Sequence, residues 1–209
     1  MFFAQDRSNP YWVGDSPTDL NAFRRGLEYL HAMQDLALEP EMVNLLESVR
    51  DRATILTWIG KNIDAVNAIL QQCLLACHDC FHPQERRSMQ IFAVPLAQSL
   101  GLDGLCNIST NPMTILIDVG RVAPDGWLSI VAHEYAHAHI ASPGHHPSFA
   151  VVLSHLCLGL GLHPPDESTE WTLRSWPPYT PTPTPLAFWR GELGGMRTET
   201  VRPSFVSNC

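Results

Sequence analysis

Basic residues are scarce in this chain, and their scarcity excludes several electrostatic functions. Its 209 residues include 13 Lys and Arg against 21 Asp and Glu, which gives a formal net charge of -8. Proteins that bind phosphate backbones draw much of their affinity from clustered Lys and Arg, which release counterions. We therefore expect neither a nucleic-acid partner nor an anionic membrane surface as a partner.

Long apolar runs are also missing. The longest, Phe149–Leu162, is interrupted by Ser154 and His155, and it is shorter than the roughly 18 to 20 residues that cross a bilayer. The first residues reach Asp6 and Arg7 without building the apolar stretch of about 7 to 15 residues that a secretory signal requires. The sequence thus predicts no membrane span and a cytoplasmic location.

Cysteine is sparse and unevenly placed. Three of the six cysteines, Cys73, Cys77 and Cys80, fall within one short segment, unlike the spread framework of a disulfide-stabilised secreted domain. We expect reduced thiols. The Cys77–His82 segment has Cys-x-x-Cys spacing with two histidines, which allows a second, structural zinc site. The helical spacing of the three cysteines favours a buried helix face instead.

Apolar residues are plentiful, and their spacing predicts helices in the first eighty residues. The hydrophobic content of 45% is enough for one real core. Apolar residues recur at intervals of three and four in a helix that Ser16 would cap and that runs to about Ala37. A second helix is predicted from Pro40, carrying Met42, Leu45, Leu46 and Val49. A third is predicted over 62–80.

After Gln90 the pattern changes to short strands followed by two helices. We predict strands at 91–94, 106–109 and 114–119, then a helix over 126–141 capped by Asp125, and another from Pro147 to about Leu160. The expected fold class is α+β and zincin-like, with a helical N-terminal part, a small twisted sheet and two metal-binding helices. The predicted division is 1–85, 86–165 and 166–209.

The last of these parts is rich in proline. Its alternating Thr-Pro repeat has a polyproline II composition, which cannot build a core. We expect a tail that packs on the domain through its large aromatic side chains, because tryptophan is rarely left fully in water. These are Trp171, Trp176, Phe188 and Trp189.

The chemistry is predicted from His133-Glu134-Tyr135-Ala136-His137, an H-E-x-x-H motif on a segment that is helical for independent reasons. Residues four apart on a helix lie about 40° from each other, so both imidazoles can reach one ion. Glu134 projects beside them, where a base would act on water. His133 and His137 are therefore the predicted metal ligands and Glu134 the predicted catalytic residue.

A catalytic zinc site needs a third protein ligand. The turn at Pro143-Gly144 folds the chain back and makes His145 the favoured ligand. The alternatives are His146 and a carboxylate, Glu167 or Glu170. His139 lies about 120° away from the ligand face and is expected to be a surface or supporting histidine.

These residues resemble the zincin-like metallopeptidases in which H-E-x-x-H is followed by a G-H-x-x-x-F element, as in SprT-like and WLM-type domains. The resemblance covers roughly Cys106 to Leu160. It implies that His133, His137 and His145 bind zinc and that Glu134 is catalytic. It also implies an edge strand just before the active helix, antiparallel to a bound peptide, and Thr114–Val119 occupies that place.

The chain departs from two related patterns. Ile140 and Pro143 stand where the longer metzincin motif has its glycine and third histidine. SprT-like proteases act on DNA-bound targets and carry basic parts that this acidic chain lacks, so their substrate class is not carried over.

We therefore predict a zinc-dependent metallopeptidase whose partner is a peptide or protein substrate. A non-catalytic, zinc-stabilised scaffold or assembly factor is the alternative. Arg121 and Tyr179 are the residues considered for stabilising the oxyanion, and the oligomeric state stays open.

Overall fold

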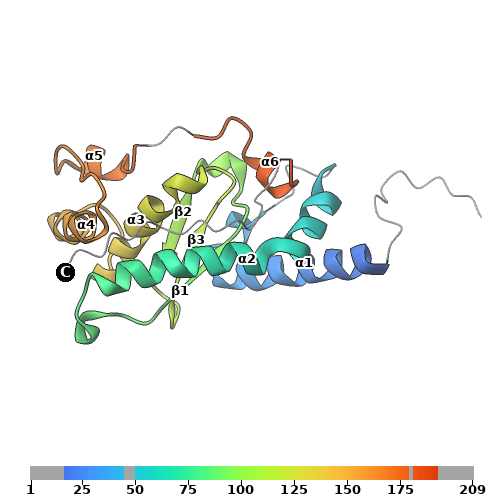
Figure 1. Cartoon of the computed structure of the whole chain (residues 1–209), viewed down its shortest axis with the longest axis horizontal. Helices are drawn as coiled ribbons and strands as arrows, with labels where there is room; N and C mark the ends of the chain where they lie inside the picture. Colours follow the sequence, from blue (N-terminus) through green and yellow to red (C-terminus); the bar gives the residue numbers. More distant parts are fainter. Residues whose placement is uncertain (1–16, 45–49, 179–180, 193–209) are drawn as a thin grey trace, which may run out of the picture.

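The computed structural model describes residues 17–44, 50–178 and 181–192. Within them the fold is mixed α+β, as predicted, with long helices packed against one three-stranded sheet (Figure 1). The elements are α1 (Pro17–Leu36), η1 (Pro40–Met42), α2 (Arg52–Asp79), η3 (Pro83–Glu85), β1 (Met89–Ala93), η4 (Gln98–Leu100), β2 (Gly104–Asn107), β3 (Met113–Ile117), η5 (Pro124–Gly126), α3 (Trp127–Ile140), α4 (Pro147–Leu160), α5 (Glu170–Arg174) and α6 (Pro185–Trp189). No helix in these ranges is both long and apolar enough to cross a membrane.

Helices α1 and α2 lie against each other along much of their length (Figure 1). Gly26 of α1 and Gly60 of α2 allow this close approach, because a Cβ at either position would collide with a backbone carbonyl oxygen of the other helix. Ser16, the predicted cap of α1, lies outside the described residues. The N-terminal pair forms one side of the core on which the rest of the chain packs.

The predicted boundaries of the second and third helices were wrong. Pro40 begins only the short 3-10 turn η1, and α2 begins at Arg52 rather than near residue 62. Buried Ile55 and Ile59 continue the apolar stripe of α2 toward its N-terminus, so the polar residues Lys61 and Asn62 do not interrupt the helix. Leu45, Leu46 and Val49 lie outside the described residues.

The sheet has the order β1-β3-β2, with β1 parallel and β2 antiparallel to β3. The expectation that Thr114–Val119 is an edge strand is therefore wrong, because β3 is the central strand. Its Ile115, Leu116 and Ile117 are fully buried, as the continuous apolar run of a central strand requires. The described edge strand beside α3 is β2.

The helices predicted over 126–141 and from Pro147 to about Leu160 are present as α3 and α4. Only α3 carries candidate metal-binding histidines, because His145 lies in the turn between the two helices. Asp125 does not cap α3: it lies in the turn η5, and Gly126 is the N-cap residue. Helix α3 ends at Ile140, its C-cap residue Ala141 has a φ of 51°, and Gly144 follows with a φ of 88°. These two residues with left-handed backbone conformation, within four positions of each other, reverse the chain sharply between the helices.

The proline-rich segment packs onto the domain through three of its four large aromatic residues. Trp176, Phe188 and Trp189 are buried, as predicted, whereas Trp171 is 76% exposed. Trp189 belongs to the same apolar core as the long helices and the sheet, and its Nε1 donates a hydrogen bond to Asp118 Oδ1 (2.8 Å). Gly120 permits the contact, because a Cβ there would collide with the Pro185 carbonyl oxygen.

Candidate metal centre

Three histidines from two parts of the chain meet in one cluster. His133 and His137 lie one turn apart on α3, and His145 comes from the turn between α3 and α4. A ring nitrogen from each lies within 4.8 Å of the others. In the ranges that the structure describes, these three form the only group of His, Cys, Asp and Glu side chains close enough to share a metal ion.

The spacing of the nitrogens fits a metal site. The Nε2 atoms of His133 and His145 are 3.1 Å apart. Two nitrogens bound tetrahedrally to one zinc ion, with bonds of about 2.0 to 2.1 Å, lie about 3.3 Å apart. The cluster could therefore hold a metal ion with little movement of its rings.

The chain reversal decides which of the paired histidines joins the cluster. His145 follows Gly144 directly and turns its ring to His133 and His137, with ring centroids 5.1 and 4.9 Å away. His146 is the N-cap residue of α4, and its side chain is exposed. His146 does not belong to the cluster, and neither do the exposed carboxylates Glu167 and Glu170.

Phe149, the aromatic residue of the G-H-x-x-x-F element, supports the rings. It is fully buried on α4, and its centroid lies 5.0 Å from that of His133, 4.4 Å from that of His137 and 4.7 Å from that of His145. One apolar side chain thus contacts all three imidazoles and limits their rotation, which preorganises them as ligands.

The environment keeps these imidazoles neutral. Burial, with a smaller contribution from repulsion by the neighbouring histidines, lowers the pKa of His133 to about 3 and that of His137 to about 4. The pKa of His145 is lowered by burial and then by the charge of Arg174. A metal ligand must be a neutral imidazole with a free lone pair, so this environment suits coordination.

The outer ring nitrogens differ between the two histidines of α3. His137 Nδ1 lies 3.4 Å from the Ser142 carbonyl oxygen, which can accept its hydrogen and leave Nε2 for a metal. His133 Nδ1 is buried and has no hydrogen-bond partner among the described residues.

Glu134 is buried beside the cluster. Only 6% of the residue is exposed. Burial, with a smaller contribution from the nearby Asp103 charge, raises the pKa of its carboxyl to about 8. No described residue donates a hydrogen bond to it. A carboxyl group in this setting has a strong tendency to take up a proton.

Strand β2 passes directly over this carboxyl group. A Cβ built at Gly104 would lie 3.1 Å from both Cγ and Oε1 of Glu134 and 3.0 Å from Ile117 Cδ1. The absence of a side chain at residue 104 therefore allows the edge strand and the Glu134 carboxyl to lie side by side.

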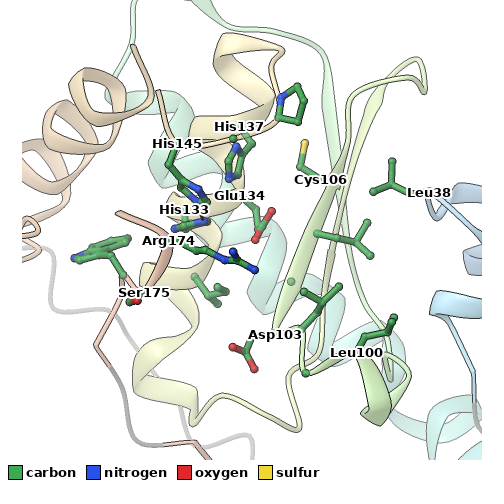
Figure 2. A pocket seen from close by; sticks show the side chains of 18 of the residues that line it. Leu38, Leu100, Asp103, Cys106, His133, Glu134, His137, His145, Arg174 and Ser175 are labelled. Atoms are coloured by element: carbon green, nitrogen blue, oxygen red, sulfur yellow. Dashed lines mark hydrogen bonds between the residues drawn. The ribbon is translucent and has the colours of Figure 1, made fainter. Parts of the chain in front are cut away.

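The cluster opens into a cleft of about 820 Å³. Figure 2 shows the three histidines, Glu134 and Arg174 on one side, β2 with Cys106 beside them, and Leu38 and Leu100 beyond the strand. A cavity of this size accommodates several residues of a peptide or an equivalent small molecule.

Sequence reasoning missed Arg174 and Asp103 as residues of the cleft. It predicted that Trp176 packs on the domain but not where: its ring lies parallel to that of His133, with centroids 6.5 Å apart. Arg174 and Trp176 follow His145 by about thirty residues and carry no motif, so no local pattern could have placed them here.

The other site residues considered from the sequence do not join the metal cluster or form a second metal site in the described residues. His139 stacks on Phe81, with centroids 4.2 Å apart, away from the metal cluster. Cys77 is fully buried on α2, and His78 Nδ1 lies 3.0 Å from the Tyr135 hydroxyl, so the described residues form no second metal site there. Arg121 is held by Asp103 at 2.8 Å. Tyr179 lies outside the described residues.

Comparisons with protein-family models, curated proteins and solved structures find no match to this chain.

Proposed function

We propose that this chain is a zinc-dependent hydrolase that cleaves peptide bonds, with His133, His137 and His145 as metal ligands and Glu134 as general base. One observation carries the proposal. Three neutral imidazoles share one cluster beside a buried carboxyl group that has no hydrogen-bond donor among the described residues.

The ligand set favours zinc among the common metals. Three imidazole nitrogens suit zinc, whereas magnesium and calcium prefer oxygen ligands. A bound zinc ion at such a site lowers the pKa of a water molecule to about 7 and polarises the scissile carbonyl group. Three protein ligands leave the fourth position of a tetrahedral site for this chemistry.

Glu134 performs the proton transfers. As a carboxylate it accepts a proton from the attacking water, and it then delivers this proton to the amine that leaves. Burial raises the pKa of Glu134, so its carboxylate, once ionised, is a stronger base toward the water proton and then holds that proton until the leaving amine takes it. Phe149 and the Ser142 carbonyl keep the imidazoles oriented during the reaction.

The sheet edge supports a peptide as the substrate. In the described residues β2 pairs only with β3, and Gly104, Leu105 and Cys106 line the cleft. An extended peptide can add to such an edge through main-chain hydrogen bonds. We therefore assign to β2 the peptide-binding role that the resemblance to zincin-like peptidases suggested for residues 114–119.

The test is Glu134→Gln, because the amide is nearly isosteric but cannot accept the water proton. Hydrolysis of a denatured-protein or peptide library should fall by at least about 10²- to 10⁴-fold, while zinc content and thermal unfolding stay close to wild type. Glu167→Gln, which changes an exposed carboxylate in the same way, should cleave like wild type.

Two outcomes would contradict the proposal. If Glu134→Gln cleaves as fast as wild type, Glu134 is not the base. If the zinc-loaded wild type cleaves nothing over a broad range of pH, and a chelator changes only its stability, the zinc-stabilised scaffold replaces the hydrolase.

A further inference from the structure

Arg174 introduces a positive charge into the cleft. It is the last residue of α5 and is exposed. It is also the only Lys or Arg among the described residues that line the cavity. In Figure 2 its side chain reaches from α5 into the cavity, beside His133 and Glu134. Its charge lowers the pKa of His145, so the guanidinium lies within electrostatic reach of the metal cluster.

No described residue neutralises this charge by contact. Asp103, the second acid of the cleft, is already in an ion pair with Arg121 (2.8 Å), and Arg121 also donates to Gln98 Oε1 (3.3 Å). Within the described ranges, Arg174 has no hydrogen-bond or ion-pair partner. Its five N–H donors are therefore available to a molecule bound in the cleft.

Folding of α5 does not require the Arg174 side chain. The short helix is anchored by the buried residues Leu173 and Trp176, and Thr169 caps its N-terminus by accepting a hydrogen bond from Thr172 N (3.2 Å). Leu38 and Leu100, which also line the cleft, are exposed apolar side chains on the other side from Arg174 (Figure 2). The charge on the α5 side therefore makes the two walls of the cleft chemically different.

We propose that Arg174 is a specificity-determining residue that binds a carboxylate of the peptide substrate close to the cleaved bond. The proposal rests on the peptidase function above and deepens it, because it names acidic peptides as the preferred substrates. A guanidinium forms two parallel hydrogen bonds with a carboxylate, whereas an uncharged amide offers a single acceptor and no charge.

The test uses the zinc-loaded protein and three pools of eight-residue peptides. Each pool is randomised over Ala, Gly, Ser, Leu and Phe, with Glu, Gln or Lys as the sixth residue type. Wild type should cleave the Glu pool at least about tenfold faster than the Gln pool, the size expected of a charge-assisted hydrogen bond. Arg174→Met should lose this ratio, and Arg174→Glu should favour the Lys pool.

The control is Arg24→Met, which removes an exposed arginine of α1 that pairs only with Glu28 in the described structure. This variant should keep the wild-type ratio between the Glu and Gln pools. The proposal is overturned if wild type shows no preference, or if Arg174→Met slows cleavage of both pools by the same factor. An equal loss would mean that Arg174 acts on the peptide backbone or on the fold.

A binding measurement separates this proposal from the hydrolase proposal. Zinc-loaded Glu134→Gln, immobilised with Arg174 intact or changed to Met, is exposed to the Glu and Gln pools. If retention of the Glu pool depends on Arg174, the proposed binding of a carboxylate by Arg174 is supported, even if wild type proves unable to cleave peptides. Equal retention of both pools with Arg174 present contradicts the proposed carboxylate binding by Arg174, whether or not the protein is a hydrolase.

Discussion

Two carboxylic acids are buried in the part of the chain that the structure describes, and their surroundings differ mainly in the hydrogen bonds they receive. Burial raises the pKa of Asp118 to about 7 and that of Glu134 to about 8. Asp118 accepts hydrogen bonds from the backbone N–H of Leu96 (3.1 Å), the backbone N–H of Gly120 (3.1 Å) and Trp189 Nε1 (2.8 Å), and a longer one from Gln98 Nε2 (3.5 Å). Glu134 accepts none from the described residues.

This difference separates a structural acid from a reactive one. Asp118 joins three parts of the chain: the segment after β1, the end of β3 and helix α6. Its hydrogen bonds offset part of the cost of burial. Glu134 bears a similar cost without such compensation and faces a metal cluster and a cleft. A buried carboxyl group that receives no hydrogen bond from the described residues and faces a cleft is a candidate for contact with a ligand or substrate.

The largest effect is expected from removing the ligands beside Glu134. Purified protein should contain about one zinc ion per chain, and His133→Ala or His137→Ala should lose it, because two imidazoles are too few for a stable site. Elemental analysis measures this without any substrate. Asp118→Asn serves as the control and should retain the metal. Full retention of zinc in both histidine variants would show that His133 and His137 do not bind the metal.

The third ligand should show the next largest effect. His145→Ala should weaken zinc binding far more than His146→Ala, because only His145 lies within reach of the other two nitrogens. Competition with a chromophoric chelator gives both affinities. The reverse order would show that the turn after Gly144 rearranges when the metal binds.

Gly104→Ala tests whether the position of Glu134 matters independently of its chemistry. The added methyl would press on the carboxyl group and on Ile117. A displacement of about 1 Å can cost on the order of 10²-fold in rate, so activity should fall by about that factor while zinc content stays unchanged. Gly159→Ala is the matched control, since a Cβ at that residue would press on Cys80 Sγ (2.7 Å) and Gly159 does not line the cleft. Equal losses in both variants would show that general strain, not Glu134, causes the effect.

Asp118→Asn tests the structural acid and should act on stability alone. The amide keeps an acceptor for Gly120 and Trp189 but turns an NH₂ group toward the Leu96 N–H. This should cost about 1 to 3 kcal/mol at pH 5. Zinc content and peptide cleavage should remain at the wild-type level.

The effect of Asp118→Asn on the free energy of unfolding should depend on pH. The folded-state pKa of Asp118, about 7, lies above its ordinary value of 3.8, so between these values the folded protein holds a proton that the unfolded chain has lost. The contribution of Asp118 to the free energy of unfolding therefore falls as pH rises from about 4 to about 7. Urea unfolding at pH 5 and pH 8 should show a smaller difference between wild type and Asp118→Asn at pH 8. A difference that grows with pH would mean that the hydrogen-bond donors around Asp118 hold it ionised.

Local patterns predicted the helix that carries the site. The period of apolar residues and the H-E-x-x-H spacing depend on neighbours three or four residues away, and both were sufficient to place His133, His137 and Glu134 on α3. The positions of α4 and of the turn before it followed from Pro147 and Gly144 in the same way. The division into three parts remains a prediction, although Trp189 shares one core with the long helices.

Only the tertiary structure decided the remaining features of the site. Trp189 and Asp118 are 71 residues apart in sequence, and no periodic pattern links them. The pairing of β3 on both sides made β2 the edge strand, and the burial of Glu134 depends on how closely β2 passes over α3 at Gly104. Arg174 enters the cleft because α5 is anchored by Leu173 and Trp176, far from the motif in sequence. The sequence by itself therefore determined which residues can bind a metal and carry a proton, whereas long-range packing determined their burial, their charge and what else faces the bound molecule.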